Sequence, residues 1–347
     1  MSDRALLEHL WWSDGALPTL ARAALTPAAI VYGGVIALRG ALYDAGILRT
    51  RATAIPAISV GNLSVGGTGK TPVAAWIAAA LVTRGAHPAI VLRGYGEDEP
   101  LVHRELNPGV PVVTAPDRVA GTARAYALGA DIAVLDDGFQ HRAAARVCDI
   151  VLVSADRWPE RWRLLPAGPM REPLDALRRA SLVIVTRKAV AADVARHVVD
   201  EIAAVVPSCP AAIVHLAVDE LRGPGGAREP LAMLQGRAVL AIASIADPRA
   251  FVAQLAAVGA VAEVAAFADH HDFSEGDITR LARAAGGPGL AVCTLKDHVK
   301  LAPLWPRGAP PLWYVSQRVE LELGGEAVDA CLDTALRARS NLPRVRR

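Results

Sequence analysis

A glycine-rich turn between an apolar run and a helical pattern constrains the fold of this 347-residue chain more than any other feature. The run Ala57–Val60 leads into the turn, Lys70 and Thr71 follow it, and Pro72 suits the first turn of a helix. Glycines let backbone N–H groups surround phosphate oxygens, and a helix N-terminus adds its positive dipole end. A purely structural glycine turn is the alternative, but the strand, turn and helix together predict a nucleotide-binding P-loop. We expect nucleotide contacts from Ser64, Val65, Gly66, Gly67, Thr68, Gly69, Lys70 and Thr71.

Two details of this loop affect its chemistry. Ser64 stands where the usual pattern begins with glycine. Lys70 is expected to neutralise the β and γ phosphates, and the Thr71 hydroxyl to ligate Mg²⁺.

A second chemical signal is the acidic pair Asp136 and Asp137, which follows the apolar run Ile132–Leu135. Adjacent carboxylates beside a phosphate site repel each other unless a cation lies between them. The pair therefore resembles a Walker B arrangement, in which a carboxylate at a strand end holds Mg²⁺. The alternative is a simple Asp137–Gly138 turn that ends the strand. Together with the P-loop, the pattern favours a metal site formed by Thr71, Asp136 and Asp137.

Ten short apolar runs alternate with helical patterns along the chain. Runs that are apolar throughout indicate parallel strands buried on both faces, so we predict an α/β fold with a P-loop NTPase-like parallel sheet flanked by helices. A loop or linker is predicted at Leu221–Pro230, which is rich in proline and glycine. It suggests a boundary between a P-loop domain, 51–220, and a second, smaller α/β domain, 221–347. The predicted strands are Ala57–Val60, Ala89–Leu92, Ile132–Leu135, Ile150–Val153, Leu182–Thr186, Ala211–Ala217, Val239–Ala243, Val261–Phe267, Leu290–Thr294 and Leu312–Val315.

Residues 1–50 form a separate N-terminal segment. Within it Ala23–Leu38 carries no charge and is bounded by Arg22 and Arg39. This stretch is shorter than the roughly 20 residues needed to cross a bilayer, and Pro27 weakens a straight helix. Two alternatives remain open: a helix packed on the protein's own core, or a helix half-sunk in a membrane surface.

Composition limits the range of partners. The formal net charge is only +2, and no run of Lys and Arg forms a stripe, so nucleic acid is not an expected partner. The four cysteines are far apart in the sequence and lack metal-ligand spacing. We expect them to be small buried hydrophobic residues in a reducing compartment, not a disulfide framework.

Longer sequence strings indicate more specifically which reaction the chain catalyses. In order along the chain they read SVGNLSVGGTGKTP, LRGYG, DDGFQHR, LLPAGPMREP, DHHDF and TLKDHVKL. This series resembles the tetraacyldisaccharide 4′-kinase family over nearly the whole chain. The resemblance implies transfer of the γ-phosphate of ATP, with Mg²⁺, to the 4′-hydroxyl of a tetraacylated glucosamine disaccharide 1-phosphate, the lipid A precursor, to form lipid IVA. It also implies an N-terminal membrane-associated helix at the cytoplasmic face of the Gram-negative inner membrane.

The resemblance also suggests catalytic residues. The family's catalytic Asp and His correspond here to Asp98 and His270, with Asp98 as the base for the sugar hydroxyl. Family members carry a longer segment before this Asp, whereas Gly96 here runs directly into Glu97, and Leu295 replaces a common Glu. Arg142 and Arg171 are candidate anchors for substrate or ATP phosphates.

Two other functions share the P-loop. One is a kinase or ATPase for a soluble metabolite, which the apolar N-terminal segment and the later strings oppose. The other is a regulatory GTPase, which commonly needs an N-K-x-D guanine-reading loop. The nearest string, Thr294–Asp297, lacks the Asn.

Overall fold

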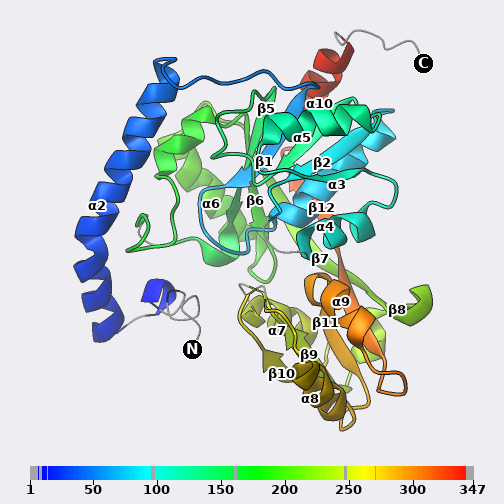
Figure 1. Cartoon of the computed structure of the whole chain (residues 1–347). Coiled ribbons are helices and arrows are strands. Elements are labelled where there is room, and N and C mark those ends of the chain that lie inside the picture. Colours follow the sequence, from blue (N-terminus) through cyan, green and yellow to red (C-terminus); the bar gives the residue numbers. More distant parts are fainter. Residues whose placement is uncertain are drawn as a thin grey trace.

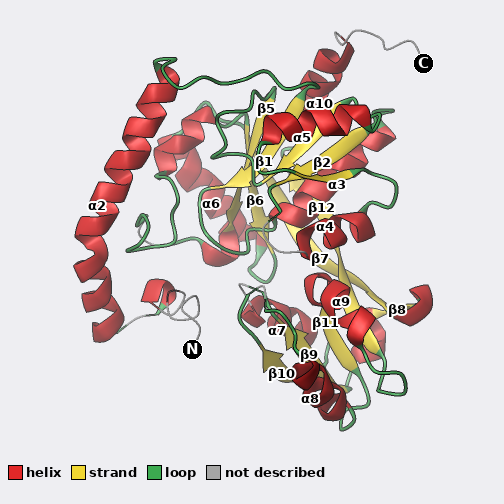
Figure 2. Ribbon diagram, viewed as in Figure 1, coloured by secondary structure: helices red, strands yellow, loops and turns green. Residues whose placement is uncertain are grey.

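The computed structural model describes residues 7, 10–13, 15–94, 98–159, 162–245, 248–269 and 271–340. Within these residues one 12-stranded sheet runs through the molecule in the order β10-β9-β11-β12-β7-β6-β5-β1-β4-β2-β3, with β8 paired to β7 (Figures 1 and 2). The strands are β1 (Ala57–Asn62), β2 (Pro88–Leu92), β3 (Val112–Thr114), β4 (Ile132–Asp136), β5 (Cys148–Ser154), β6 (Leu182–Arg187), β7 (Ala211–Arg222), β8 (Arg228–Pro230), β9 (Ala238–Ala243), β10 (Val261–Ala266), β11 (Ala291–Thr294) and β12 (Leu312–Leu323). The α-helices are α2 (Ala16–Asp44), α3 (Lys70–Thr83), α4 (Asp98–Leu106), α5 (Arg118–Ala127), α6 (Ala192–Val205), α7 (Pro248–Ala257), α8 (Glu275–Ala285), α9 (Leu295–Leu301) and α10 (Gly325–Ser340).

The central strands are buried on both faces, as their apolar sequences require. In β5, Ile150 and Leu152 enter the core under α3 and α10, whereas Val151 and Val153 enter the core under α6. Successive side chains of a strand point to opposite faces, so a continuous apolar run supplies two cores at once. Helices therefore cover both sides of this part of the sheet.

The same arrangement is repeated in the second half of the molecule. In β9, Val239 and Ala241 pack in the core that includes residues of α7, and Leu240 and Ile242 pack in the core that includes residues of α8. The long strands β7 and β12 pair antiparallel and join this half to the central strands. The chain then returns, and α10 packs against the core of the first half through Val328.

The predicted α/β class is confirmed, with a mostly parallel sheet flanked by helices and an apolar N-terminal helix. All ten predicted strands are present. The sheet is not parallel throughout, because β12 runs antiparallel to β7. The segment Leu221–Pro230 is not only a loop: it contains the end of β7, with Leu221 fully buried, and the short strand β8. The division at residues 50 and 220 remains a prediction.

The N-terminal helix is longer than the sequence predicts. α2 has 29 residues, continues through Pro27, and is long and apolar enough by length and composition to cross a membrane. It stands along one side of the molecule (Figure 1), and Ala29 is its one buried residue. Arg22 and Arg39 lie inside the helix because their side chains reach backbone carbonyls elsewhere in the chain. The alternative of a buried core helix is therefore wrong.

Two of the four cysteines depart from the expectation. Cys148 at the start of β5 and Cys331 in α10 form a disulfide across 183 positions of sequence. Cys209 and Cys293 are free, as expected. Sequence spacing alone could not indicate the pair, because the packing of α10 on the sheet creates it.

Candidate active site

The register of the central strands brings the two predicted phosphate-site motifs together. β1 and β4 are parallel neighbours, and Val60 pairs with Asp136. The P-loop begins where β1 ends, and the acidic pair stands where β4 ends. Ligands of parallel α/β sheets bind at such carboxyl edges, so this edge is where a nucleotide site is expected.

Local hydrogen bonds hold the P-loop in shape. The Thr68 hydroxyl accepts a hydrogen bond from Asn62 Nδ2 at 2.9 Å, and the Thr68 carbonyl accepts one from the Thr186 hydroxyl, also at 2.9 Å. Gly69 has φ of 81°, a left-handed conformation, and a Cβ there would collide with the Leu216 side chain. Glycine is therefore required immediately before α3, whose first residue is Lys70.

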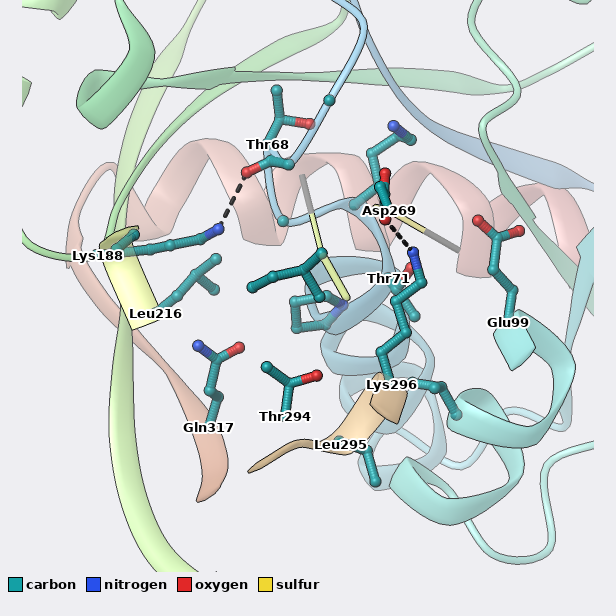
Figure 3. Close-up of a pocket in the computed structure, with 18 of the residues that line it drawn as sticks. Thr68, Thr71, Glu99, Lys188, Leu216, Asp269, Thr294, Leu295, Lys296 and Gln317 are labelled. Carbon is teal, nitrogen blue, oxygen red and sulfur yellow. Dashed lines mark hydrogen bonds and ion pairs between the residues drawn. The ribbon is translucent and has the colours of Figure 1, made fainter. Parts of the chain in front are cut away.

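The loop opens into a cavity of about 600 Å³, a volume typical of small-molecule sites. In Figure 3, Thr68 and Thr71 of the P-loop face this space, with Lys188 and Gln317 on one side and Lys296 with Asp269 on the other. The cavity thus lies between the central strands and the second half of the molecule. The apolar part of its lining consists of Leu216, Val218, Ile245, Ala250, Phe251, Leu295 and Val315, among others.

The two carboxylates of the acidic pair lie in different environments. Asp137 lies 3.8 Å from Lys70 Nζ and accepts hydrogen bonds from Arg171 Nη1 at 2.9 and 3.0 Å. Burial alone raises the pKa of Asp137, but the charges of Lys70 and Arg171 outweigh it and hold the pKa below its usual value. Asp136 is buried and pairs with His103 at 2.8 Å. Both carboxylates line the cavity with Thr71.

Asp98 lies where the two halves of the molecule meet. It begins α4, is 3 % exposed, and its Oδ2 is 3.8 Å from Lys296 Nζ and 4.0 Å from Lys300 Nζ, both on α9. Lys296 also forms a 2.7 Å ion pair with Asp269 (Figure 3). Burial lowers the pKa of Lys300, partly opposed by Asp297 and Asp98. The neighbouring Glu99 lines the cavity.

Most of the predicted site residues gather at this cavity. Val65 to Thr71, Asp136, Asp137 and Arg171 line it. Ser64 and Asp98 do not line it: Ser64 forms an isolated bridge with Met170, and Asp98 is buried beside Lys296. His270 and the Gly96–Glu97 junction lie outside the described residues. The adjacent His271 has a structural position, 3.1 Å from Asp277 at the start of α8.

Arg142 is not among the cavity residues. Its guanidinium bonds to the Asp44 carboxylate at 2.6 Å and to the Gly40 carbonyl at 3.1 Å, and it stacks on the Tyr43 ring. These partners all belong to α2, so Arg142 fastens the N-terminal helix and does not reach the nucleotide cavity. No sequence pattern indicates this contact, because it spans about a hundred positions.

Several residues at the cavity are not evident from the sequence. Lys188 lines the cavity and donates to the Gly67 carbonyl at 3.0 Å. Its position just after β6 was a usable signal, since parallel strands end at one edge. Arg118 and Lys296 line the cavity from helices, where nothing in their spacing distinguishes them from surface residues. The same holds for His103 of α4, which does not line the cavity but pairs with Asp136.

The fold and cavity define a P-loop phosphotransferase, in which a nucleotide phosphate site faces acid and lysine side chains from a second half of the chain. The sequence model for the family described as tetraacyldisaccharide-1-P 4′-kinase matches residues 21–337. The chain belongs to this family, and it is a kinase.

Individual relatives agree with this assignment. The tetraacyldisaccharide 4′-kinase of Anaeromyxobacter dehalogenans (strain 2CP-1) is 40% identical, with 95% of each chain covered. That of Geobacter metallireducens is 38% identical over 84% of this chain and 92% of its own. The structure of LpxK from Aquifex aeolicus in complex with ATP superposes with a TM-score of 0.69 at 28% identity, covering 90% of this chain and 99% of that one. The soluble-metabolite kinase and GTPase alternatives are not favoured.

Proposed function

We propose that this kinase transfers the γ-phosphate of ATP to the 4′-hydroxyl of tetraacyldisaccharide 1-phosphate, the lipid A precursor, giving lipid IVA. The observation that carries the proposal is the meeting of the P-loop, the acidic pair and Lys296 around one cavity in a chain with an exposed apolar N-terminal helix. The buried Asp98 lies directly behind Lys296, with its Oδ2 3.8 Å from Lys296 Nζ. The names of the relatives indicate the same substrate.

The donor set at the acidic pair fits Mg²⁺. This ion is commonly bound by one or two carboxylates together with substrate phosphates, and the cavity offers Asp136, Asp137 and the Thr71 hydroxyl. Among the described residues no group of three or more His, Cys, Asp or Glu side chains is arranged for a metal, so phosphates would complete the coordination. Bound Mg²⁺ would neutralise phosphate charge during transfer.

The protein's own contribution to transfer is positioning and charge. Lys70 and the amides of the loop before α3 stabilise the phosphate oxygens as charge shifts toward the leaving β-phosphate. The 4′-oxygen forms a bond to the γ-phosphorus while the bond to the β-phosphate oxygen breaks, releasing ADP. The hydroxyl proton passes to the carboxylate of Asp98, assisted by His270. Such base assistance contributes about 10²- to 10⁴-fold.

The membrane helix lies against the loops of the site. The Tyr32 hydroxyl donates to the Arg171 carbonyl at 2.9 Å, and Arg39 Nη2 donates to the Gln140 carbonyl at 2.9 Å. Because the middle of α2 touches the protein body, we infer that α2 lies on the membrane surface and does not cross it. The kinase would then work at the cytoplasmic face of the inner membrane, with the headgroup of its lipid substrate reaching the cavity.

The direct test is incubation with ATP, Mg²⁺ and tetraacyldisaccharide 1-phosphate, reading out a bis-phosphorylated lipid. Wild-type chain should form it. Lys70→Ala should bind nucleotide weakly and form little product. Asp98→Asn should bind ATP normally but lose about 10²-fold or more in kcat. If Lys70→Ala retained both affinity and product formation, the proposal would be wrong.

A further inference from the structure

One buried hydrogen bond joins α4 to the metal-site carboxylate. His103 Nε2 lies 2.8 Å from Asp136 Oδ2, with side-chain exposures of 0 % and 5 %. A carboxylate can only accept, so Nε2 carries the hydrogen and donates it. No other side chain among the described residues bonds to this carboxylate, and its remaining oxygen is the one available to a cation.

The packing of β4 does not explain why a carboxylate stands at position 136. The four preceding residues, Ile132 to Leu135, are apolar and fully buried, and a fifth apolar residue would continue the same core. A buried carboxylate instead costs free energy unless it is paired or binds a cation. Asp136 nevertheless ends the strand and lines the nucleotide cavity. A chemical role at the cavity accounts for that cost.

The helix that carries His103 is fixed on two sides. Asn107 Nδ2 donates to the Ala75 carbonyl of α3 at 2.9 Å, and the Tyr314 hydroxyl of β12 donates to Glu105 at 3.1 Å. These anchors hold α4 to the P-loop helix and to the long strand of the second half. They place the imidazole ring independently of its bond to Asp136.

Among the described residues, no side chain or backbone group competes for the other ring nitrogen. His103 Nδ1 is buried and has no hydrogen-bond partner among the described residues. The one strong polar contact of the ring is therefore with Asp136. Leaving a buried nitrogen unsatisfied costs free energy. The hydrogen bond from Nε2 to Asp136 is therefore the contact that accounts for the position of the ring.

We infer that His103 is a positioning residue that fixes the orientation of the Asp136 carboxylate for Mg²⁺ bound with the nucleotide. The inference rests on the proposed metal role of Asp136. Partners of this kind orient metal ligands, and their loss typically costs about 10- to 100-fold in metal affinity or activity. α4 also begins with Asp98, so one rigid helix sets both the proposed base and the metal carboxylate.

The test measures metal binding without requiring turnover. Mn²⁺ binding to the full-length chain with a non-hydrolysable ATP analogue is followed by electron paramagnetic resonance of free Mn²⁺. His103→Asn places an amide too short to reach Asp136, whereas the amide of His103→Gln reaches the position of Nε2. The control is His215→Gln, because His215 forms a similar pair with Glu320 at 3.2 Å and does not line the cavity.

His103→Asn should weaken Mn²⁺ affinity about 10- to 100-fold, and His103→Gln should restore most of it. Affinity for the analogue in EDTA should not change in either variant, nor should Mn²⁺ affinity in the control. If His103→Asn does not fold, His103→Met replaces it. Equal Mn²⁺ affinity in His103→Asn and wild type, or an equal loss in the Asn and Gln variants, would overturn the inference. If wild type itself fails to bind Mn²⁺ with the analogue, the proposed function falls instead.

Discussion

The Tyr32 hydroxyl donates a hydrogen bond to the Arg171 carbonyl at 2.9 Å, and the Arg171 guanidinium in turn holds Asp137 at 2.9 Å. One residue, Arg171, thus links Tyr32 in the middle of the exposed helix α2 to a carboxylate of the proposed phosphate site. Around this contact α2 fits closely to the protein body: a Cβ on Gly33 would lie only 2.9 Å from Leu164 Cδ1. The helix therefore supports the loop that carries Arg171.

Tyr32→Phe should reduce kcat on the lipid substrate about fivefold, the value of one neutral hydrogen bond of about 1 kcal/mol. Burial raises the pKa of Tyr32, so the hydroxyl stays protonated and able to donate at neutral pH. ATP affinity should not change. Steady-state kinetics checks this, with Tyr126→Phe on the exposed side of α5 as the control. A loss in Tyr126→Phe equal to that in Tyr32→Phe would contradict the proposed support.

The apolar surface of α2 gives a second prediction. Val31 and Val35 are 68 % and 57 % exposed, one turn apart on the helix. Replacing both with Glu should lower binding to vesicles at least about tenfold, because each apolar side chain loses roughly 1.5 kcal/mol or more of burial in lipid. Flotation with phosphatidylglycerol vesicles measures this, and ATP affinity should be unchanged. Undiminished vesicle binding would show that this face does not contact the membrane.

Much of the fold can be predicted because the central strands are apolar without interruption. The strands that escape prediction are short: β3 has three residues, and β8 is the sequence Arg-Glu-Pro. The antiparallel pairing of β12 also escapes, although Val319 to Leu323 alternate apolar and charged residues, a pattern typical of a half-exposed strand. α2 is underestimated because charged residues commonly bound an apolar helix, yet Arg22 and Arg39 donate to backbone carbonyls outside α2 and the helix continues past both.

The site divides in a similar way. The P-loop and the acidic pair are contiguous strings whose chemistry is local, so the sequence predicts them by residue. By contrast, the contacts of His103, Lys188 and Lys296 are long-range: their partners lie 33, 121 and 27 positions away in the sequence, respectively. Such contacts depend on the strand order and on how α4 and α9 approach each other. Arg142 shows the opposite case: it belongs to a predicted site motif, but its side chain binds α2 and not the cavity.

Asp277 at the start of α8 gives a pH prediction. Hydrogen bonds from the Ser274 side chain, then from His271 and the Ser274 backbone, lower its pKa to about 2. A depressed folded-state pKa stabilises the protein at pH values above the unfolded pKa, near 4, and this stabilisation is lost as the pH falls toward 2. The stability difference between wild type and Asp277→Asn should therefore be constant from pH 7 to 5 and shrink below about pH 4. Urea unfolding at each pH tests this; a difference that grew on acidification would contradict the assignment.

Asp137, a proposed metal ligand, also has an uncommon backbone conformation. It is the one non-glycine residue with positive φ, 54°, among the described parts of the chain. Asp and Asn tolerate this left-handed conformation, whereas other side chains cost roughly 1–2 kcal/mol there. Asp137→Ala should therefore unfold about 1 kcal/mol more easily than Asp137→Asn, as measured by urea denaturation.

In the same two variants, kinase activity should depend on the loss of the negative charge and not on the backbone conformation. Both Asn and Ala remove the carboxylate that faces Lys70 and Arg171, so both should lose about tenfold or more in apparent Mg²⁺ affinity. Asp137→Gly relaxes the backbone and should lose activity to a similar extent while remaining well folded. If Asp137→Asn kept wild-type Mg²⁺ dependence while Asp137→Ala lost it, the carboxylate would matter only for the turn. Asp136 would then be left as the single protein carboxylate for the cation.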